Sequence, residues 1–287
     1  MMIQSILVGL DWGETAEAAA AVAAELAIAW EASVKALYVE DAELIRAAEQ
    51  AVLAGFPESG PIPYAVPTIP ELETEFASEE RALGRRFLKL VADTRIHGSF
   101  QVAQGEVDRI LIRESRAHDL LVMGKYSQPA PEAGGRPLGR NVERILRHVW
   151  SPVVLVPPDG KLGPNLLVAY DGSAGSHRAL ASAVRVARAI DGSLRVVAVG
   201  KPAAADALLE EAESYLDAHR AAAELVAREG ITAQEILREV EEYEADLLAM
   251  GAFGPARRKE SFGAGVTLDV LEGVRRAALV CGSMDED

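Results

Sequence analysis

The chain has 287 residues, 49% hydrophobic and 25% charged, which is typical of globular protein and long enough for two domains. Its net charge of −15 is divided between 15 basic and 22 acidic residues in 1–157 and 14 and 22 in 158–287. We therefore expect no nucleic-acid and no anionic membrane partner, since phosphate binding needs a basic surface. The single cysteine, Cys281, excludes an internal disulfide and is predicted to be a small buried hydrophobe.

In chain order, the first half alternates short apolar runs with segments of helical periodicity. Strands are predicted at 6–10, 33–39, 99–104, 119–124 and 153–156, and helices at 15–31, 71–94, 108–116 and 140–149. Five prolines within 55–70 predict that no regular element forms there. We favour the whole excursion, 41–70, as a cover over a pocket of the first half, with a partner-docking lid as the other interpretation.

The second half repeats this order in a shorter form. Strands are predicted at 166–170, 194–199, 246–250 and 277–281, and helices at 175–190, 204–229, from Thr232 onward, and at 266–274. A third strand has no visible counterpart here. Alternating strands and helices predict a parallel sheet with right-handed crossovers. The predicted fold is α/β, with two copies of a doubly wound, five-stranded parallel sheet and the second copy lacking its third strand.

Two sequence matches indicate that one domain occurs twice. Residues 6–19 read ILVGLDWGETAEAA and residues 166–179 read LLVAYDGSAGSHRA, at an offset of 160. Residues 119–124, DLLVMG, match residues 246–251, DLLAMG. This period is far too long for a solenoid repeat. The predicted domains are residues 1–157 and 165–287, with a Pro/Gly-rich linker over 158–164.

The candidate binding residues follow the predicted strands. Asp11 and Asp171 come after the first strand of each copy, and Gly124 and Gly251 come after the fourth. Ligands of open parallel sheets bind beyond the carboxyl ends of the strands. Glycines there let backbone N–H groups approach an anion, and the following helix offers its positive N-terminus.

On these residues the chain resembles the universal stress protein family in tandem form, whose sheets are similar to those of adenine-nucleotide alpha-hydrolases. ATP-binding members carry Gly-x2-Gly-x9-Gly-Ser/Thr after the fourth strand, for phosphates and ribose. An Asp after the first strand and a Val ending the second hold the nucleoside, and a Gly-x-Pro ends the third. The resemblance implies a cytoplasmic stress-response protein that is not an enzyme, apart from slow ATP hydrolysis at most.

Each copy matches this pattern in part. In the first copy the corresponding residues are Asp11, Val39, Gly105, Gly124, Ser127, Gly139, Arg140 and Asn141. Ser127 replaces the second loop glycine, Arg140 stands at the hydroxyl position, and the loop is two residues too long. In the second copy they are Asp171, Val199, Gly251, Gly254, Gly265, Val266 and Thr267. There the nine-residue spacing is kept, Ala264 and Gly265 replace the Gly-Ser pair, and Thr267 lies two residues further on.

Two interpretations of these loops stay open. In the first, the glycines only make tight turns, nucleotide binding is reduced or lost, and the protein acts through assembly or an unknown protein partner. In the second, the protein is a regulator that binds ATP or another adenine nucleotide, with Mg²⁺, in one copy. Family dimers often pair their last strands, which implies an intrachain pseudo-dimer joining 153–156 to 277–281 and leaves a further homodimer open. Five scattered histidines predict no metal site.

Overall fold

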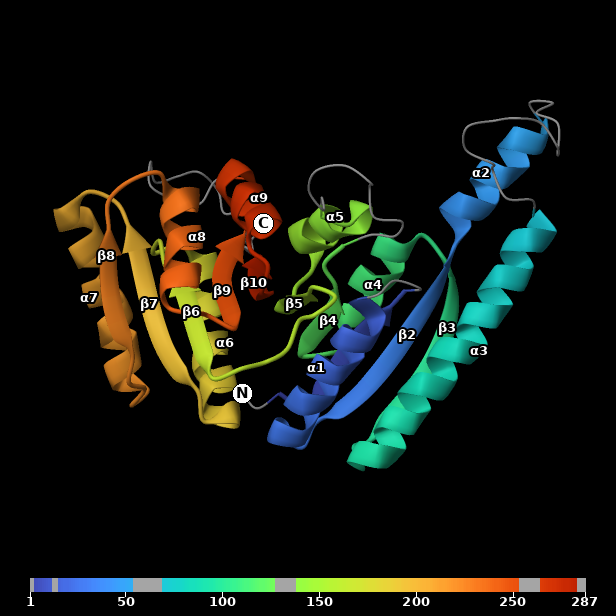
Figure 1. Ribbon diagram of the computed structural model, residues 1–287, viewed down its shortest axis with the longest axis horizontal. Coiled ribbons are helices and arrows are strands. Elements are labelled where there is room, and N and C mark those ends of the chain that lie inside the picture. The colour runs from blue at the N-terminus through green and yellow to red at the C-terminus, as the bar shows by residue number, and fades with distance from the viewer. Residues whose placement is uncertain (1–2, 12–14, 54–68, 127–137, 253–263, 283–287) are drawn as a thin grey trace.

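One continuous sheet runs through the whole molecule (Figure 1). The computed structural model describes residues 3–11, 15–53, 69–126, 138–252 and 264–282. Within these residues the strand order is β3-β2-β1-β4-β5-β10-β9-β6-β7-β8. The strands of the first copy are β1 (Ser5–Leu10), β2 (Ser33–Asp41), β3 (Gly98–Gly105), β4 (Leu120–Gly124) and β5 (Val153–Val156). Those of the second copy are β6 (Asn165–Ala169), β7 (Ser193–Val199), β8 (Glu224–Arg228), β9 (Leu247–Ala252) and β10 (Ala277–Gly282).

The two copies join through their last strands. Strand pairs within each copy are parallel, whereas β5 and β10 pair antiparallel, with Leu279 opposite Val154 and Ala278 opposite Leu155. Both strands are short, apolar and buried, and pairing them removes two edges that would otherwise be exposed. The predicted intrachain pairing of 153–156 with 277–281 is therefore confirmed.

Helices cover both faces of the sheet, and each face has its own apolar core. The helices of the first copy are α1 (Thr15–Trp30), α2 (Ala42–Leu53), α3 (Ile69–Thr94), α4 (Val107–Ser115) and α5 (Arg140–His148). Those of the second copy are α6 (Ala174–Ile190), α7 (Pro202–Ala218), α8 (Thr232–Glu242) and α9 (Ala264–Gly273). Side chains of α1, α3, α6 and α7 pack on one face, and those of α4, α5, α8 and α9 pack on the other.

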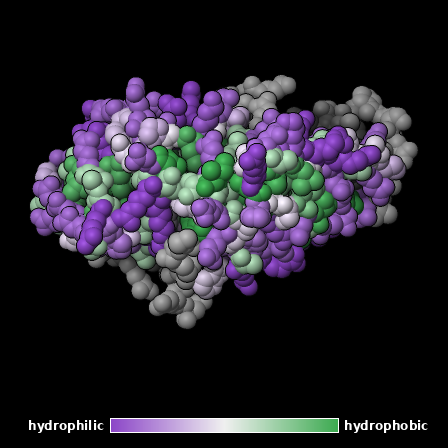
Figure 2. Space-filling view, turned by 90° about the horizontal axis from the view of Figure 1, so that it is seen from below, coloured by the Kyte–Doolittle hydropathy of each residue, from purple (hydrophilic) through white to green (hydrophobic). Residues whose placement is uncertain are grey.

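Alternation along the strands explains how one sheet serves two cores. Ile6 and Val8 of β1 face the α1 side, and Leu7 between them faces the α4 side. Seen from below, hydrophobic residues form a band along the molecule between hydrophilic margins, as expected for a sheet between two helical layers (Figure 2). Buried alanines of α1, among them Ala19 and Ala23, let that helix lie close to the sheet.

The second copy does have a third strand, contrary to the sequence prediction. The predicted helix over 204–229 is instead α7 followed by β8, which pairs parallel with β7 in the register Arg195–Glu224. Arg220, at a φ of 52°, turns the chain out of α7, and Ala221 N–H bonds back to Leu216 O at 2.9 Å. Alanine-rich sequence favours helix, but pairing with β7 outweighs that local preference.

An ion-pair network around a buried carboxylate holds the edge strand β8. Glu239 of α8 is fully buried and accepts from Arg195 of β7 and Arg228 of β8, each at 2.7 Å. Arg195 also reaches Glu224 at 2.6 Å and lies 4.1 Å from the centre of the Tyr243 ring. These contacts tie β7, β8 and α8 together. They depend on residues far apart in the sequence, which is why local patterns do not reveal the strand.

The excursion after β2 contains more regular structure than predicted. Residues 42–53 form α2, for which no helix was predicted, and α3 begins at Ile69 with Pro70 in its first turn, where proline is tolerated. In Figure 1, α2 extends outward from the end of β2 beside the first half of α3. Residues 54–68 lie outside the described parts, so the cover and the lid both stay predictions.

Truncating Leu279 tests the junction between β5 and β10. Leu279 is 1% exposed, so Leu279→Ala is expected to lower the free energy of unfolding by about 2–5 kcal/mol. Ile28→Ala, at a residue 53% exposed, is the matched control and is expected to change it by less than about 0.5 kcal/mol. Urea unfolding followed by circular dichroism measures both. Equal effects of the two substitutions would contradict the buried junction.

Candidate functional site

The carboxyl ends of the parallel strands bring most of the candidate residues to one edge of each copy. Strand order reverses between β1 and β4 in the first copy and between β6 and β9 in the second, which is where ligands of open α/β sheets bind. In the first copy, Leu10 pairs with Tyr38, Val39 with Ala103, and Gly124 with Val156, so Asp11, Val39, Gly105 and Gly124 share this edge. In the second copy, the same edge holds Asp171, Val199 and Gly251.

The first-copy loop is closed at its base by backbone hydrogen bonds. Gly139 N–H donates to Lys125 O at 3.1 Å, and Tyr126 forms an antiparallel bridge with Leu138. The two ends of the loop, with Gly124 and Gly139, are therefore brought together. Asn141 lies half-buried in the first turn of α5. Ser127 and the side chain of Arg140 lie outside the described residues, as does Gly254 in the second copy.

The glycines that end β4 and β9 have a packing role. A Cβ on Gly124 would lie 2.1 Å from Thr15 Oγ1, and a Cβ on Gly251 would lie 2.6 Å from the backbone nitrogen of Ser176. In each copy the first turn of α1 or α6 thus packs directly on the glycine. Protein atoms fill the position that a Cβ would take on either glycine. This favours the interpretation that the two glycines allow a helix to pack closely on a strand.

Asp171 also has a local structural role. Its Oδ1 accepts from Ser173 N–H at 3.0 Å, and Ser173 Oγ in turn accepts from Ser176 N–H at 3.1 Å, capping the N-terminus of α6. Asp171 is 4% exposed, and its first-copy counterpart Asp11 is half-buried between β1 and α1. At Asp171 and Ser173, side-chain acceptors thus satisfy N–H groups at the start of α6.

A counterpart to Gly105 escaped the sequence comparison. Gly105 ends β3 at a φ of 155°, and Gly230 follows β8 at a φ of 153°; each stands two residues before a helix, α4 or α8. Such a φ is readily adopted only by glycine. The sequence signal was the glycine two residues before Thr232, and the predicted helix over 204–229 concealed it.

Two threonines carry buried hydroxyls without partners. Among the described residues, Thr15 Oγ1 and Thr267 Oγ1 are the buried side-chain atoms that make no hydrogen bond. Thr15 opens α1, and Thr267 lies in the first turn of α9, at the start of a buried stripe with Val270 and Leu271. Gly265, in the same turn but exposed, has nothing within 4 Å of an added Cβ. A buried unpaired hydroxyl costs about 1–3 kcal/mol, so each needs an explanation.

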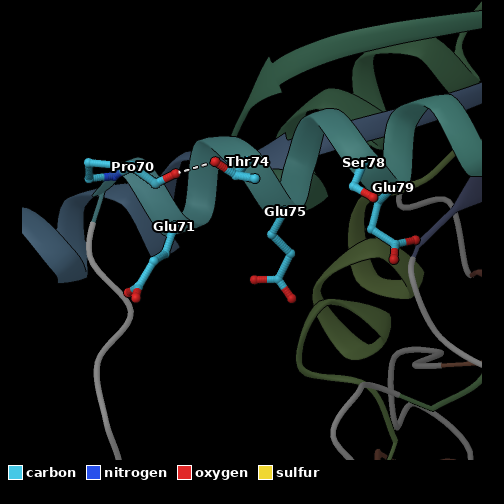
Figure 3. A pocket seen from close by; sticks show the side chains of 6 residues that line it. All are labelled: Pro70, Glu71, Thr74, Glu75, Ser78 and Glu79. Carbon is cyan, nitrogen blue, oxygen red and sulfur yellow. Dashed lines mark hydrogen bonds between the residues drawn. The ribbon is translucent and has the colours of Figure 1, made fainter.

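The groove along α3 is a separate, acidic feature. Figure 3 shows Glu71, Glu75 and Glu79 projecting from one side of the helix into the groove, which Pro70, Thr74 and Ser78 also line. Burial raises the pKa of Tyr38, and carboxylates that include Glu79 and Glu75 raise it further. No candidate nucleotide residue lines this groove, and its negative charge disfavours a polyphosphate.

The described parts of the chain also bear on metal and membrane sites. They contain no group of three or more His, Cys, Asp or Glu residues placed to hold a metal ion. None of their helices combines the length and the apolar character needed to span a membrane. Cys281 is 2% exposed, as predicted for a small buried hydrophobe, with its Sγ 3.9 Å from Ser182 Oγ.

The thiol of Cys281 is expected to be inert in the folded protein. Burial raises its pKa to about 11, so the nucleophilic thiolate is scarce at pH 8 and the sulfur is shielded. A chromogenic disulfide reagent at pH 8 should label no thiol in the native protein and one per chain in urea. Rapid labelling of the native protein would contradict this burial.

Alanine substitutions distinguish packed from open glycines. Gly251→Ala is expected to lower the free energy of unfolding by about 1–3 kcal/mol, because its Cβ meets backbone. Gly265→Ala, in open space within a helix, is expected to raise it by about 0.5–1 kcal/mol. Chemical denaturation measures both. A neutral Gly251→Ala would show that the space is not filled by α6.

Comparison with known proteins shows which family this chain belongs to. The universal stress protein family model matches the chain twice, over residues 2–157 and 164–280. A universal stress protein of Synechocystis sp. is 28% identical over 277 residues, covering 94% of this chain and 96% of that protein. The crystal structure of a universal stress protein from Archaeoglobus fulgidus has a TM-score of 0.75 at 18% identity, covering 99% of this chain and 100% of that one. A functionally unknown protein from Pseudomonas aeruginosa PAO1 has a TM-score of 0.62 at 18% identity, covering 98% and 93%. The chain therefore belongs to the universal stress protein family and carries two of its domains in tandem.

Proposed function

We propose that this chain is a non-enzymatic stress-response protein that binds one adenine nucleotide, in its second copy, at the N-terminus of α9. The observation that carries the proposal is the buried hydroxyl of Thr267, which makes no hydrogen bond among the described residues. A ligand oxygen that accepts from this hydroxyl would remove the cost of burying it.

The position of Thr267 suits an anion. It lies in the first turn of a ten-residue helix, where backbone N–H groups lack intrahelical partners and the helix dipole is positive. Gly265 in the same turn is exposed and adds no side chain there. The loop before α9 keeps the family's Gly-x2-Gly-x9 spacing, which supports the second copy over the first.

Each residue of the second copy has a binding role in this proposal. The first turn of α9 would hold phosphate through Thr267 Oγ1 and its backbone N–H groups. Val199, 7% exposed at the end of β7, would present backbone to the base. Asp171 lies at the same edge and would orient the ribose. Where Mg²⁺ accompanies the nucleotide, it would neutralise phosphate charge.

A second candidate function is partner binding through the assembled tandem, without nucleotide. The close packing of α1 on Gly124 and of α6 on Gly251 favours it, since it gives both glycines a structural role that needs no ligand. The paired β5 and β10 already provide the dimer-like unit on which a protein partner would act. The two functions differ in one observable, the affinity for nucleotide.

Removing each orphan hydroxyl tests the proposal. Isothermal titration calorimetry with ATP, with and without Mg²⁺, gives the affinity of the wild type, Thr267→Val and Thr15→Val. Thr267→Val is expected to bind ATP about 10- to 100-fold more weakly, because it loses a hydrogen bond to a charged group. Thr15→Val makes the same change in the first copy and should leave the affinity unchanged.

Stability serves as the control in this experiment. Both substitutions remove an unpaired buried hydroxyl, so neither should lower the free energy of unfolding of the ligand-free protein. Lost affinity in Thr15→Val alone would place the site in the first copy. No detectable binding by the wild type at millimolar ATP would reject the nucleotide proposal and leave partner binding.

A further inference from the structure

Lys125 crosses from the first copy into the second. It follows Gly124 at the end of β4 and is fully buried. Its Nζ donates a hydrogen bond to the main-chain oxygen of Val274, 149 residues further along the chain. Val274 comes directly after α9, so a side chain from the candidate loop of one copy meets the candidate helix of the other. In Figure 1, α5 and α9 lie on either side of this central junction.

The acceptor is the C-terminal end of α9. The last carbonyl groups of a helix have no intrahelical donors, and the helix dipole is negative there. Val274 N–H bonds back to Val270 O at 2.8 Å, which leaves the carbonyl of Val274 pointing beyond the helix. Lys125 supplies both a donor and a positive charge at this position. It therefore caps α9 from the other copy.

The backbone of Lys125 makes hydrogen bonds within the first copy, whereas its side chain bonds to the second copy. Its N–H donates to Val156 O of β5 at 2.9 Å, and its carbonyl accepts from Gly139 N–H at 3.1 Å. Its Nζ also lies 5.2 Å from the centre of the Tyr126 ring. One residue thus links β4, β5 and the start of α5 to the end of α9.

The chemistry of this contact differs from that of the surrounding apolar core. Burial lowers the pKa of Lys125 to about 8, and the carboxylate of Glu272 on α9 opposes that shift. A charged group buried here is costly unless it is paired, so apolar packing alone does not account for a lysine. The corresponding residue after Gly251 is Ala252, which is too short to reach back. The connection therefore runs in one direction only.

We propose that Lys125 is a latch between the copies, which fixes the C-terminus of α9 to the β4 loop of the first copy and thereby holds the N-terminus of α9 in place for its ligand. The contact between Lys125 and α9 does not depend on the function proposed above. Only its effect on nucleotide affinity rests on that function. A helix held at one end loses less freedom when a ligand orders the other end.

Hydrogen exchange of the intact protein tests the latch. In Lys125→Met, which keeps the length of the side chain and removes the ammonium, amides of residues 270–274 are expected to exchange at least about tenfold faster. Amides of α6 should be unchanged. Lys201→Met, at an exposed lysine before α7, is the matched control and should alter neither region.

Two further measurements keep the outcomes separate. Exchange at 270–274 within about twofold of wild type in a folded Lys125→Met protein would overturn the latch. If that variant does not fold, Glu272→Gln at an exposed residue removes the carboxylate that favours the charged form of Lys125. Unchanged exchange of residues 270–274 in that variant would overturn the latch instead. ATP titration of Lys125→Met then tests whether the latch affects nucleotide binding. Weakened ATP binding supports this effect, and unchanged affinity overturns it. The latch itself is decided by the hydrogen-exchange result. If the wild type binds no ATP, the nucleotide site is rejected and the latch is not.

Discussion

The antiparallel pairing of β5 with β10 is the constraint on which the rest of the molecule depends. Each copy alone would end in a short, fully apolar strand with an open edge. Joining these edges gives one sheet and lets both cores continue through the junction: Val154 and Leu279 belong to the core on one face, and Leu155 and Val280 to the core on the other. The two copies therefore share one sheet and both apolar cores. A buried lysine at the same junction links the first candidate loop to the C-terminal end of α9.

This arrangement explains why the two copies differ in their sites. Within a single sheet, the second copy keeps the loop spacing of the family, while each copy has one buried threonine hydroxyl, Thr15 or Thr267, without a hydrogen bond among the described residues. The first copy instead has a longer loop, the lysine that reaches α9, and an acidic groove along α3 that none of the candidate residues lines. These differences underlie the proposed division of roles, in which the first copy positions a helix of the second and the second binds the ligand.

Most of the fold could be predicted from the sequence, because the internal repeat, the alternation of strands and helices and the apolar last strands are local patterns. The third strand of the second copy could not. Alanine-rich residues 221–228 favour helix, and only pairing with β7 and the contacts of Arg195 and Arg228 with Glu239 define β8. At the candidate site, motif matching found Gly124, Gly251 and Thr267. It did not indicate that α1 and α6 fill the space at both glycines, nor that Lys125 contacts Val274, because such contacts join residues distant in sequence.

The measurement that tests the central claim most directly is native-state hydrogen exchange of β5 and β10 as a function of denaturant. The account predicts that amides of Val153–Val156 and Ala277–Gly282 are among the slowest to exchange and open together, with one free energy and one dependence on denaturant. Amides of β10 that exchange readily while those of β5 stay protected would show that the copies open independently. That result would contradict a single sheet held at its centre.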